Sequence, residues 1–288
     1  MYKLKPQKIN FDNKLCSSFT GHIYPYQKAP GDHRYVVKHI MAHDIDELFL
    51  FLQEVILGFN CDHPSIHSVQ GYHIEKIQPR GFNIYIKYNR NVESLTHVIE
   101  RCRNEKKYLT EEEIIKILYN ISCGLEYLHN KNIAHKNIKP IDIMIDSEGK
   151  AQLGGIGTNE ILEDNKANVL FAKSVVSCYK APELQSSTQK LKRRDLFKAD
   201  VWSLGVNIAE LCVLKTDFVN FSLQSPKKIE ADIQKKLKGL EGRYSKAFME
   251  LLSGMLRYDP AQRKHIKDIR IMLEEQFTSI LVILSLFI

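Results

Sequence analysis

The stretch that decides the fold reads His135-Lys136-Asn137-Ile138-Lys139-Pro140-Ile141-Asp142 and then, after a short interval, Leu153-Gly154-Gly155-Ile156-Gly157. Between its two parts, residues 143–145 and 150–153 predict a pair of short strands around the turn residues 146–149. A polar loop, a hairpin and a glycine-rich turn thus follow one another directly. We expect the chain to carry its chemistry here.

The first third of the chain predicts strands around a single helix. Alternating apolar residues bounded by turn residues indicate strands at residues 19–26, 35–40, 68–77 and 81–88. Residues 44–59 predict an amphipathic helix instead, because apolar residues recur there at intervals of three and four. These residues are Ile45, Leu48, Phe49, Leu52, Val55, Ile56 and Phe59.

The remainder of the chain predicts long helices. Thr110 and Glu113 form a capping-box signature, and apolar residues on one face continue that helix to Leu128. Further helices are predicted at residues 198–214, 229–237, 245–256 and 265–277. A β-rich part followed by a helical part is typical of the α+β class. We predict a small β-rich lobe at 1–87, a larger helical lobe at 88–277 and an apolar tail at 278–288.

Composition excludes a disordered or fibrous chain, since 44% of the 288 residues are apolar and can bury a large core. The formal net charge is +7, with basic clusters at Lys190–Arg194 and Lys227–Lys238. We interpret these clusters first as solvated surface. The alternative is that they dock an acidic partner, nucleic acid or a membrane surface.

The cysteines and the two ends of the chain indicate a reducing, cytoplasmic setting. The six cysteines are scattered without a C-x-x-C pair, so neither a disulfide framework nor a metal site is expected, and the amino-terminal residues lack the apolar run of a signal peptide. The tail Ile280–Ile288 is nearly all apolar. As a helix it would reach only about 13 Å and could not span a bilayer of about 30 Å. It could pack on the body of the protein, contact a partner or a membrane surface, or be an artefact of the gene model.

Segments in the same order along the chain resemble the eukaryotic protein kinase family. The resemblance rests on Val36-Val37-Lys38, on Glu54 ahead of the turn His63-Pro64, on Tyr127-Leu128-His129, on Ala181-Pro182-Glu183, on Asp200-Val201-Trp202-Ser203-Leu204-Gly205 and on Asp259-Pro260-Ala261-Gln262-Arg263. Residues 95–108 and Asn132-Ile133-Ala134-His135 look most like the NIMA-related kinases.

The resemblance implies a two-lobed fold that binds ATP between its lobes. It implies an ion pair between Lys38 and Glu54 that holds the ammonium group at the α and β phosphates. It also implies an ion pair between Glu183 and Arg263 in the larger lobe, where Asp200 would anchor the backbone. Ile86 would be the gatekeeper, and Lys87 and Tyr88 would belong to the hinge beside the adenine.

Two positions depart from the family where its chemistry is done. The family has its catalytic base, an aspartate, where this chain has Asn137, and its magnesium-binding aspartate where this chain has Gly155. An amide cannot accept the substrate proton, and glycine offers no ligand to Mg²⁺. The glycine-rich loop that covers the phosphates keeps only its last glycine, Gly21, since Cys16 and Ser18 replace the others.

Four further positions bear on chemistry. Lys139, which contacts the transferring phosphate in the family, is retained, and Asp142 replaces the metal-binding asparagine and is the one candidate metal ligand. Lys136 replaces the arginine whose bidentate fork reads a phosphorylated activation loop. Val176 replaces the threonine whose hydroxyl tethers the catalytic loop.

We therefore expect a pseudokinase that acts as a scaffold or allosteric regulator with weak ATP binding and doubtful Mg²⁺ binding. Protein partners are expected, whereas nucleic acid and a transmembrane span are not. Two alternatives stay open. One is an atypical active Ser/Thr kinase that uses Lys38, Lys139 and Asp142, and the other is a basic adaptor that binds polyanions.

Overall fold

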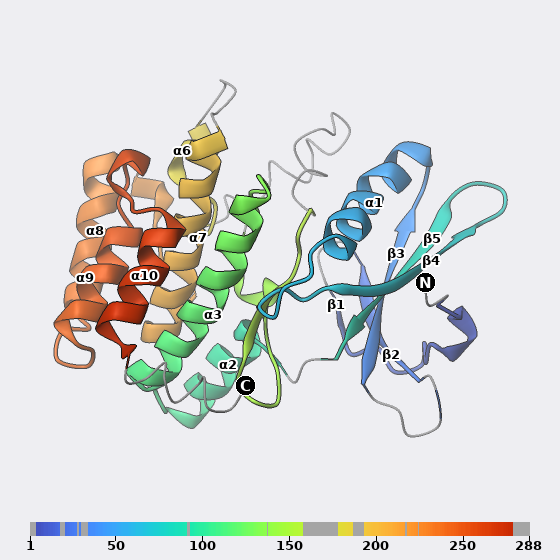
Figure 1. Ribbon diagram of the computed structural model, residues 1–288, viewed down its shortest axis with the longest axis horizontal. Coiled ribbons are helices and arrows are strands. Elements are labelled where there is room, and N and C mark those ends of the chain that lie inside the picture. Colours follow the sequence, from blue (N-terminus) through green and yellow to red (C-terminus); the bar gives the residue numbers. More distant parts are fainter. Residues whose placement is uncertain are drawn as a thin grey trace. The chain divides into compact units, whose positions relative to one another are not determined.

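The computed structural model describes residues 4–17, 21–27, 29, 34–90, 93–136, 138–157, 178–186, 193–216, 218–223 and 225–278. The chain divides into two compact units (Figure 1). Unit 1 comprises residues 1–92 and 153–172, and unit 2 comprises residues 93–152 and 173–288.

Unit 1 is built on an antiparallel five-stranded sheet of order β1-β2-β3-β5-β4. Its strands are β1 (Cys16–Ser17), β2 (His22–Tyr26), β3 (Tyr35–Ala42), β4 (Val69–Lys76) and β5 (Phe82–Asn89). The four predicted strands are confirmed with small shifts at their ends. The register pairs Lys38 of β3 with Ile86 of β5, and Val36 with Tyr88.

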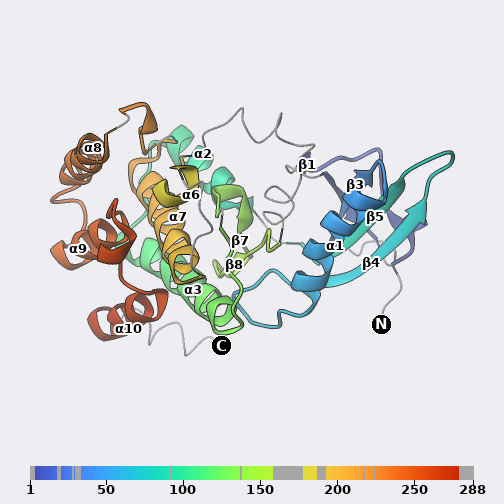
Figure 2. The same cartoon turned by 90° about the horizontal axis from the view of Figure 1, so that it is seen from above.

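Helix α1 (Ile45–Phe59) lies along one face of this sheet (Figures 1 and 2). Asp44 ends the preceding loop in an extended conformation, and its carboxylate accepts the Glu47 N–H at 2.8 Å, which caps the first turn. The helix predicted over residues 44–59 is therefore confirmed. Its buried side packs into a core formed by Ile40, Ala42, Leu48, Val55, Val69, Ile84 and Ile86.

The amino-terminal segment covers the opposite face of the sheet. A short 3₁₀-helix, η1 (Pro6–Lys8), lies between two buried residues, Leu4 and Ile9, and Ile9 forms a bridge to Tyr26. Leu4 and Ile9 complete a second core with Tyr26, Val37 and Tyr85. Because side chains alternate along a strand, residues 84, 86 and 88 of β5 face α1, whereas residues 85 and 87 face the amino-terminal segment.

The segment that follows Leu153 is attached to unit 1. Leu153 forms a parallel bridge with Ile66, and its N–H donates to the Ser65 carbonyl at 2.9 Å. Gly157 has φ +86°, and a Cβ there would lie only 3.1 Å from the Gln53 carbonyl oxygen of α1. Glycine is thus required at 157 both by the backbone conformation and by the approach to α1.

Unit 2 begins with a small sheet and two helices. The sheet has the order β6-β7-β8, with β6 (Glu93–Ser94), β7 (Ile143–Ile145) and β8 (Ala151–Leu153), so the predicted hairpin is confirmed. The helices are α2 (Leu95–Glu105) and α3 (Glu111–Asn130), and the 3₁₀-helix η2 spans Pro140–Asp142. Thr110 and Glu113 form both hydrogen bonds of the predicted capping box at the start of α3.

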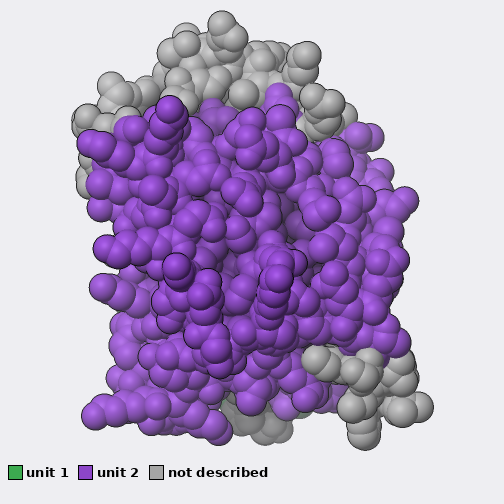
Figure 3. Space-filling model, turned by 90° about the vertical axis from the view of Figure 1, so that its left-hand side faces the viewer, with its two compact units in different colours: residues 1–92, 153–172 green, residues 93–152, 173–288 purple. Residues whose placement is uncertain are grey.

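The remaining helices complete a bundle around α7 (Figures 1 and 2). They are α6 (Pro182–Ser186), α7 (Arg193–Val213), η4 (Phe221–Leu223), α8 (Pro226–Lys238), α9 (Lys246–Met255), η5 (Pro260–Gln262) and α10 (Ile266–Gln276). Every residue from 198 to 212 is buried, which identifies α7 as the central helix, with α3 and α9 packed against it. Figure 3 views unit 2 from the side on which α8 and α9 lie in Figure 1.

Candidate functional site

A buried ion pair joins β3 to α1 in unit 1. Lys38 Nζ lies 2.8 Å from Glu54 Oε1 and 2.7 Å from Oε2, and the two side chains are only 8% and 4% exposed. The predicted ion pair is therefore present. Because both charges are buried, removing either one would leave the other unpaired and would destabilise the fold.

Tyr88 of β5 reaches the same carboxylate from the neighbouring strand. Its hydroxyl donates to Glu54 Oε1 at 2.7 Å. Desolvation, together with the negative charge of Glu54 and the hydrogen bond to it, raises the pKa of the Tyr88 hydroxyl well above its ordinary value. The hydroxyl thus stays protonated and donates at physiological pH. Glu54 accepts from an ammonium group and a phenol at once.

His67 extends this arrangement to the end of β5. Its ring stacks on the ring of Tyr88, with 5.0 Å between centroids and 26° between planes, and its Nε2 lies 2.8 Å from the Asn89 carbonyl oxygen. Desolvation lowers the pKa of His67, although the Asn89 carbonyl opposes that shift. A neutral ring at pH 7 can donate from Nε2 to this carbonyl. Sequence reasoning missed both His67 and the contact between Tyr88 and Glu54.

Ile86 and Lys87 have other surroundings. Ile86 is fully buried in the core beneath α1. The side chain of Lys87 points to the opposite face, where its Nζ lies 4.5 Å from the centroid of the Tyr35 ring. Lys87 pairs with Val37 on one side and Gly71 on the other, so it lies inside the sheet. Tyr88 is the member of this predicted group that reaches the ion pair, while nucleotide contact by any of the three stays a prediction.

Gly21 has a structural reason to be glycine. A Cβ at this position would lie 2.1 Å from the His39 carbonyl oxygen of β3, a distance at which the strand would have to move. Its contact with phosphates stays a prediction. Ser18 and the Cys16 side chain, the other two positions of the predicted loop, lie outside what the structure describes.

The structure describes one of the two positions that lack the family's carboxylates. Gly155 is described, and its φ of +71° places it in the left-handed region. Asparagine and aspartate are the residues that tolerate this region best after glycine, so the backbone does not exclude an aspartate at position 155. Asn137 lies outside the described residues.

In unit 2 the loop that precedes Asn137 is fixed by Asp200 of α7, a fully buried residue. Its carboxylate accepts the His135 N–H at 2.9 Å and the Lys136 N–H at 2.6 Å, and His129 Nε2 lies 2.8 Å away. Lys136 has φ +71°, a conformation that non-glycine residues rarely adopt. The hydrogen bonds to Asp200 offset that cost, so the predicted anchoring role of Asp200 is confirmed.

The residues on the other side of Asn137 are also anchored. Asn207 of α7 donates from Nδ2 to the Ile138 carbonyl at 3.0 Å. Asp142 Oδ2 accepts the Lys139 N–H at 3.1 Å, which caps the 3₁₀-helix η2. One oxygen of the candidate metal ligand thus has a local structural partner. The predicted phosphate contact of Lys139 and metal contact of Asp142 stay predictions.

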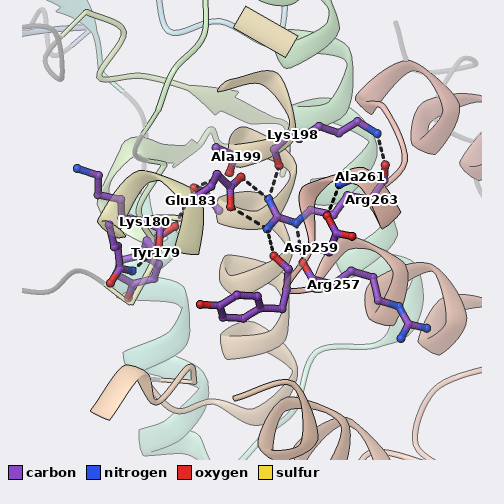
Figure 4. Close-up of polar contacts among 12 residues, drawn as sticks. Tyr179, Lys180, Glu183, Lys198, Ala199, Arg257, Asp259, Ala261 and Arg263 are labelled. Carbon is purple, nitrogen blue, oxygen red and sulfur yellow. Dashed lines mark hydrogen bonds and ion pairs between the residues drawn. The ribbon is translucent and has the colours of Figure 1, made fainter. Parts of the chain in front are cut away.

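The predicted pair of Glu183 and Arg263 is present and includes more partners than expected (Figure 4). Arg263 donates to both carboxylate oxygens of Glu183, at 2.7 and 3.0 Å. Its three remaining N–H groups donate to the carbonyls of Arg257, Lys198 and Tyr258. All five donors of the guanidinium group are therefore used, and the group lies 4.9 Å from the centroid of the Trp202 ring.

Several predicted features lie outside the described residues. They are Val176 within the activation segment 158–177, Lys190 to Lys192 together with the side chains of Arg193 and Arg194, and the tail from Ile280. The segment that is described again from Cys178 onward is tied to α7. Tyr179 donates to Glu210 Oε2 at 2.7 Å, and its carbonyl accepts from Ser203 at 2.8 Å. Glu210 was not singled out from the sequence.

Comparison with known proteins agrees with this geometry. The model of the family described as protein kinase domain matches residues 11–274. Serine/threonine-protein kinase 16 of Mus musculus is 27% identical over 251 residues, which are 84% of this chain and 81% of that protein. Serine/threonine-protein kinase Nek2 of Mus musculus is 26% identical over 230 residues, which are 76% of this chain and 48% of that protein.

A shorter match has higher identity. Mitogen-activated protein kinase kinase kinase 5 of Arabidopsis thaliana is 32% identical over 171 residues, which are 59% of this chain. The family model covers most of the chain, and the ion pairs of Lys38 and Arg263 and the anchor at Asp200 lie within it. The chain belongs to the protein kinase domain family and has its α+β fold, with a β-sheet lobe and a helical lobe.

Proposed function

We propose that this protein is a pseudokinase, a kinase fold that has lost phosphoryl transfer and serves as a scaffold or allosteric regulator. One observation carries the proposal. The buried polar groups that hold the fold are kept, at Lys38, Glu54, Asp200 and Arg263, while the base and metal positions hold Asn137 and Gly155. The chain retains the structural residues of a kinase without its two chemical carboxylates.

The residues at the family's metal positions provide few carboxylate oxygens for a metal ion. Mg²⁺ usually takes one or two carboxylates in addition to phosphate oxygens. Gly155 supplies none, and one oxygen of Asp142 already accepts the Lys139 N–H. Loss of a positioned base costs roughly a further 10²–10⁴ in rate. These residues fit a magnesium-dependent phosphoryl transfer poorly, which supports the proposal.

We also propose that the protein binds ATP only weakly. Lys38 is in place, and its ammonium group is paired with Glu54. Other phosphate contacts are expected from the glycine-rich loop, which keeps only Gly21 of the family's three glycines. We therefore propose an ATP affinity that is low and largely independent of Mg²⁺.

Two alternatives have their own support. The relatives bear the names of serine/threonine-protein kinases, which favours an atypical active kinase that uses Lys38, Lys139 and Asp142. The net charge of +7 favours a basic adaptor that binds polyanions.

Within the family we propose that the chain belongs to the NIMA-related group. Serine/threonine-protein kinase 16 is the rival assignment, because it aligns over a larger share of this chain than Nek2 does. Scattered free cysteines favour a reducing compartment such as the cytoplasm.

Radiometric ATP turnover, combined with calorimetric titration of ATP with and without Mg²⁺, tests the proposal. We expect no turnover and the same weak affinity in both titrations. Turnover that Lys38→Met abolishes would establish the active kinase instead. Strong magnesium-dependent binding that Asp142→Ala removes would show that the metal site is functional. Binding to polyanions that falls steeply with salt would favour the adaptor.

A further inference from the structure

Helix α1 exposes four large apolar side chains to solvent. Ile45, Phe49, Ile56 and Phe59 are 50%, 62%, 50% and 47% exposed. They account for four of the nine large hydrophobic side chains that are exposed in the described part of the chain. All four belong to the apolar stripe that the sequence predicts. The structure buries Leu48 and Val55 of that stripe and leaves these four in solvent.

The exposed residues have the spacing of a helix-pairing seam. Together with the half-buried Leu52, they occur at intervals of four, three, four and three residues along α1. This spacing is the seam of a coiled coil, where each apolar side chain inserts between four residues of a facing helix. We call Ile45, Phe49, Leu52, Ile56 and Phe59 the α1 seam. Its shape therefore fits a second helix better than it fits an extended peptide.

Acidic residues at the amino-terminal end of the α1 seam limit which helices could pair with it. Asp46 is exposed in the first turn, beside Ile45 and next to the capping Asp44, and α1 contains no basic residue. Glu47 lies on the other side of the helix, where its carboxylate accepts the His43 N–H at 2.8 Å. Two copies paired in parallel would bring these acidic turns together. Two copies paired antiparallel would bring each acidic turn to the negative end of the other helix dipole. Both arrangements are unfavourable, so a second copy of this chain is a poor occupant.

We propose that the α1 seam binds an amphipathic helix of a partner protein, antiparallel to α1, with lysine or arginine in the last turn of that helix. The basic last turn would face Asp46 and would also be favoured by its own helix dipole. At the other end, the ring of Phe59 contacts Tyr72 of β4, so the apolar surface continues onto the sheet. The proposal goes beyond the function proposed above, because this binding requires neither nucleotide nor catalysis.

A fluorescence anisotropy titration of the full chain tests it. The probe is a synthetic helical peptide of about 18 residues, or five turns, with leucines at the seam spacing and lysines in its last turn. A matched peptide carries glutamates in place of those lysines. The seam variant is Phe49→Ser with Ile56→Ser. The control variant is Phe11→Ser, an aromatic residue of similar exposure whose ring lies near Tyr24 and Tyr85, on the sheet face opposite α1.

We expect the lysine peptide to bind the parent and the Phe11→Ser variant alike, and the seam variant at least tenfold more weakly. Asp46→Lys should weaken binding at low salt, and the glutamate peptide should bind weakly. Melting curves by circular dichroism should show the seam variant folded, since its changed side chains are exposed. Failure of the lysine peptide to bind the parent, or equal binding by the seam variant or the glutamate peptide, would overturn the proposal.

Two other occupants are decided by parallel measurements. Sedimentation of the parent at rising concentration would reveal a dimer, and a dimer that the seam variant lacks would make a second copy the occupant. Flotation with vesicles of phosphatidylcholine and phosphatidylserine would reveal membrane binding. If vesicles bind the parent but not the seam variant, the α1 seam is a lipid contact and the partner helix is refuted.

Discussion

Glu54 shows how a single residue connects fold and function. Its carboxylate accepts two hydrogen bonds from Lys38 and one from Tyr88, so a buried negative charge is balanced by one positive charge and one phenol. Tyr88 and Glu54 are 34 residues apart in the sequence. The contact depends on the alternation of side chains along β5, which brings residue 88 to the face that α1 covers.

Tyr88→Phe tests whether this hydroxyl contributes to stability. Removing a hydrogen bond to a charged group typically costs about 1.5–3 kcal/mol, and we expect a loss of that size in the free energy of unfolding measured with urea. Tyr24→Phe on the opposite face of the sheet is the control and should change stability by less than about 0.5 kcal/mol. Equal values for the two variants would mean that water replaces the Tyr88 hydroxyl at Glu54.

At the scale of elements, the sequence predicted the helices and strands whose apolar residues recur at regular intervals. The helix over 44–59 is predictable because its apolar residues recur at helical intervals, but periodicity does not tell which of those residues are buried. The seven apolar residues divide into a buried set and an exposed set only once the sheet is in place. The 3₁₀-helix η1 was missed because three residues carry no period.

The site was predictable to the same extent. The pairs of Lys38 with Glu54 and of Glu183 with Arg263 followed from the resemblance, and both are present. His67 and Glu210 could not be found in this way, because their partners are determined by strand register and by helix packing over long separations. The one available signal was the position of Glu210, an acidic residue within the mostly apolar stretch 206–213 of α7.

Arg263 holds η5, α6 and α7 together, so its substitution tests an arrangement of elements. Arg263→Lys keeps the charge but replaces a planar fork of five donors with a single ammonium group of three. We expect a loss of about 3–5 kcal/mol in the free energy of unfolding, since buried partners would be left unpaired. Arg257→Lys is the matched control. Its side chain is 41% exposed and its guanidinium lies 3.3 Å from Glu230, and an exposed pair contributes about 0–1 kcal/mol. A loss at Arg263 as small as that of the control would contradict the anchoring role.

At the scale of the whole molecule, the chain divides its residues by role. Positions that satisfy buried backbone and charged groups match the protein kinase family, whereas the positions of its catalytic base and of its main metal-binding aspartate hold Asn137 and Gly155. A buried ion pair that loses one partner destabilises the fold. Folding depends on these buried pairs and not on phosphoryl transfer, so stability alone would not distinguish a pseudokinase from an active kinase.

Restoring both carboxylates tests this division directly. Catalytic groups that act as a unit give little when restored singly, so Asn137→Asp and Gly155→Asp should each leave turnover at the level of the parent. The double variant should have measurable activity if the remaining groups still support phosphoryl transfer. Gly155→Ala is the control, because it also adds a Cβ at φ +71°, at a cost of about 1–2 kcal/mol, but adds no carboxylate.

Each variant must first be shown to be folded by its urea transition, and turnover is then measured radiometrically with ATP and Mg²⁺. Activity in the double variant but not in the Asn137→Asp/Gly155→Ala control would assign the loss to the metal ligand and the base together. No activity in the double variant would indicate that the glycine-rich loop, where Cys16 and Ser18 replace glycines, also limits phosphoryl transfer. Robust turnover in the unmodified chain, removed by Lys38→Met, would instead show that this fold transfers phosphate without either aspartate and would refute the pseudokinase proposal.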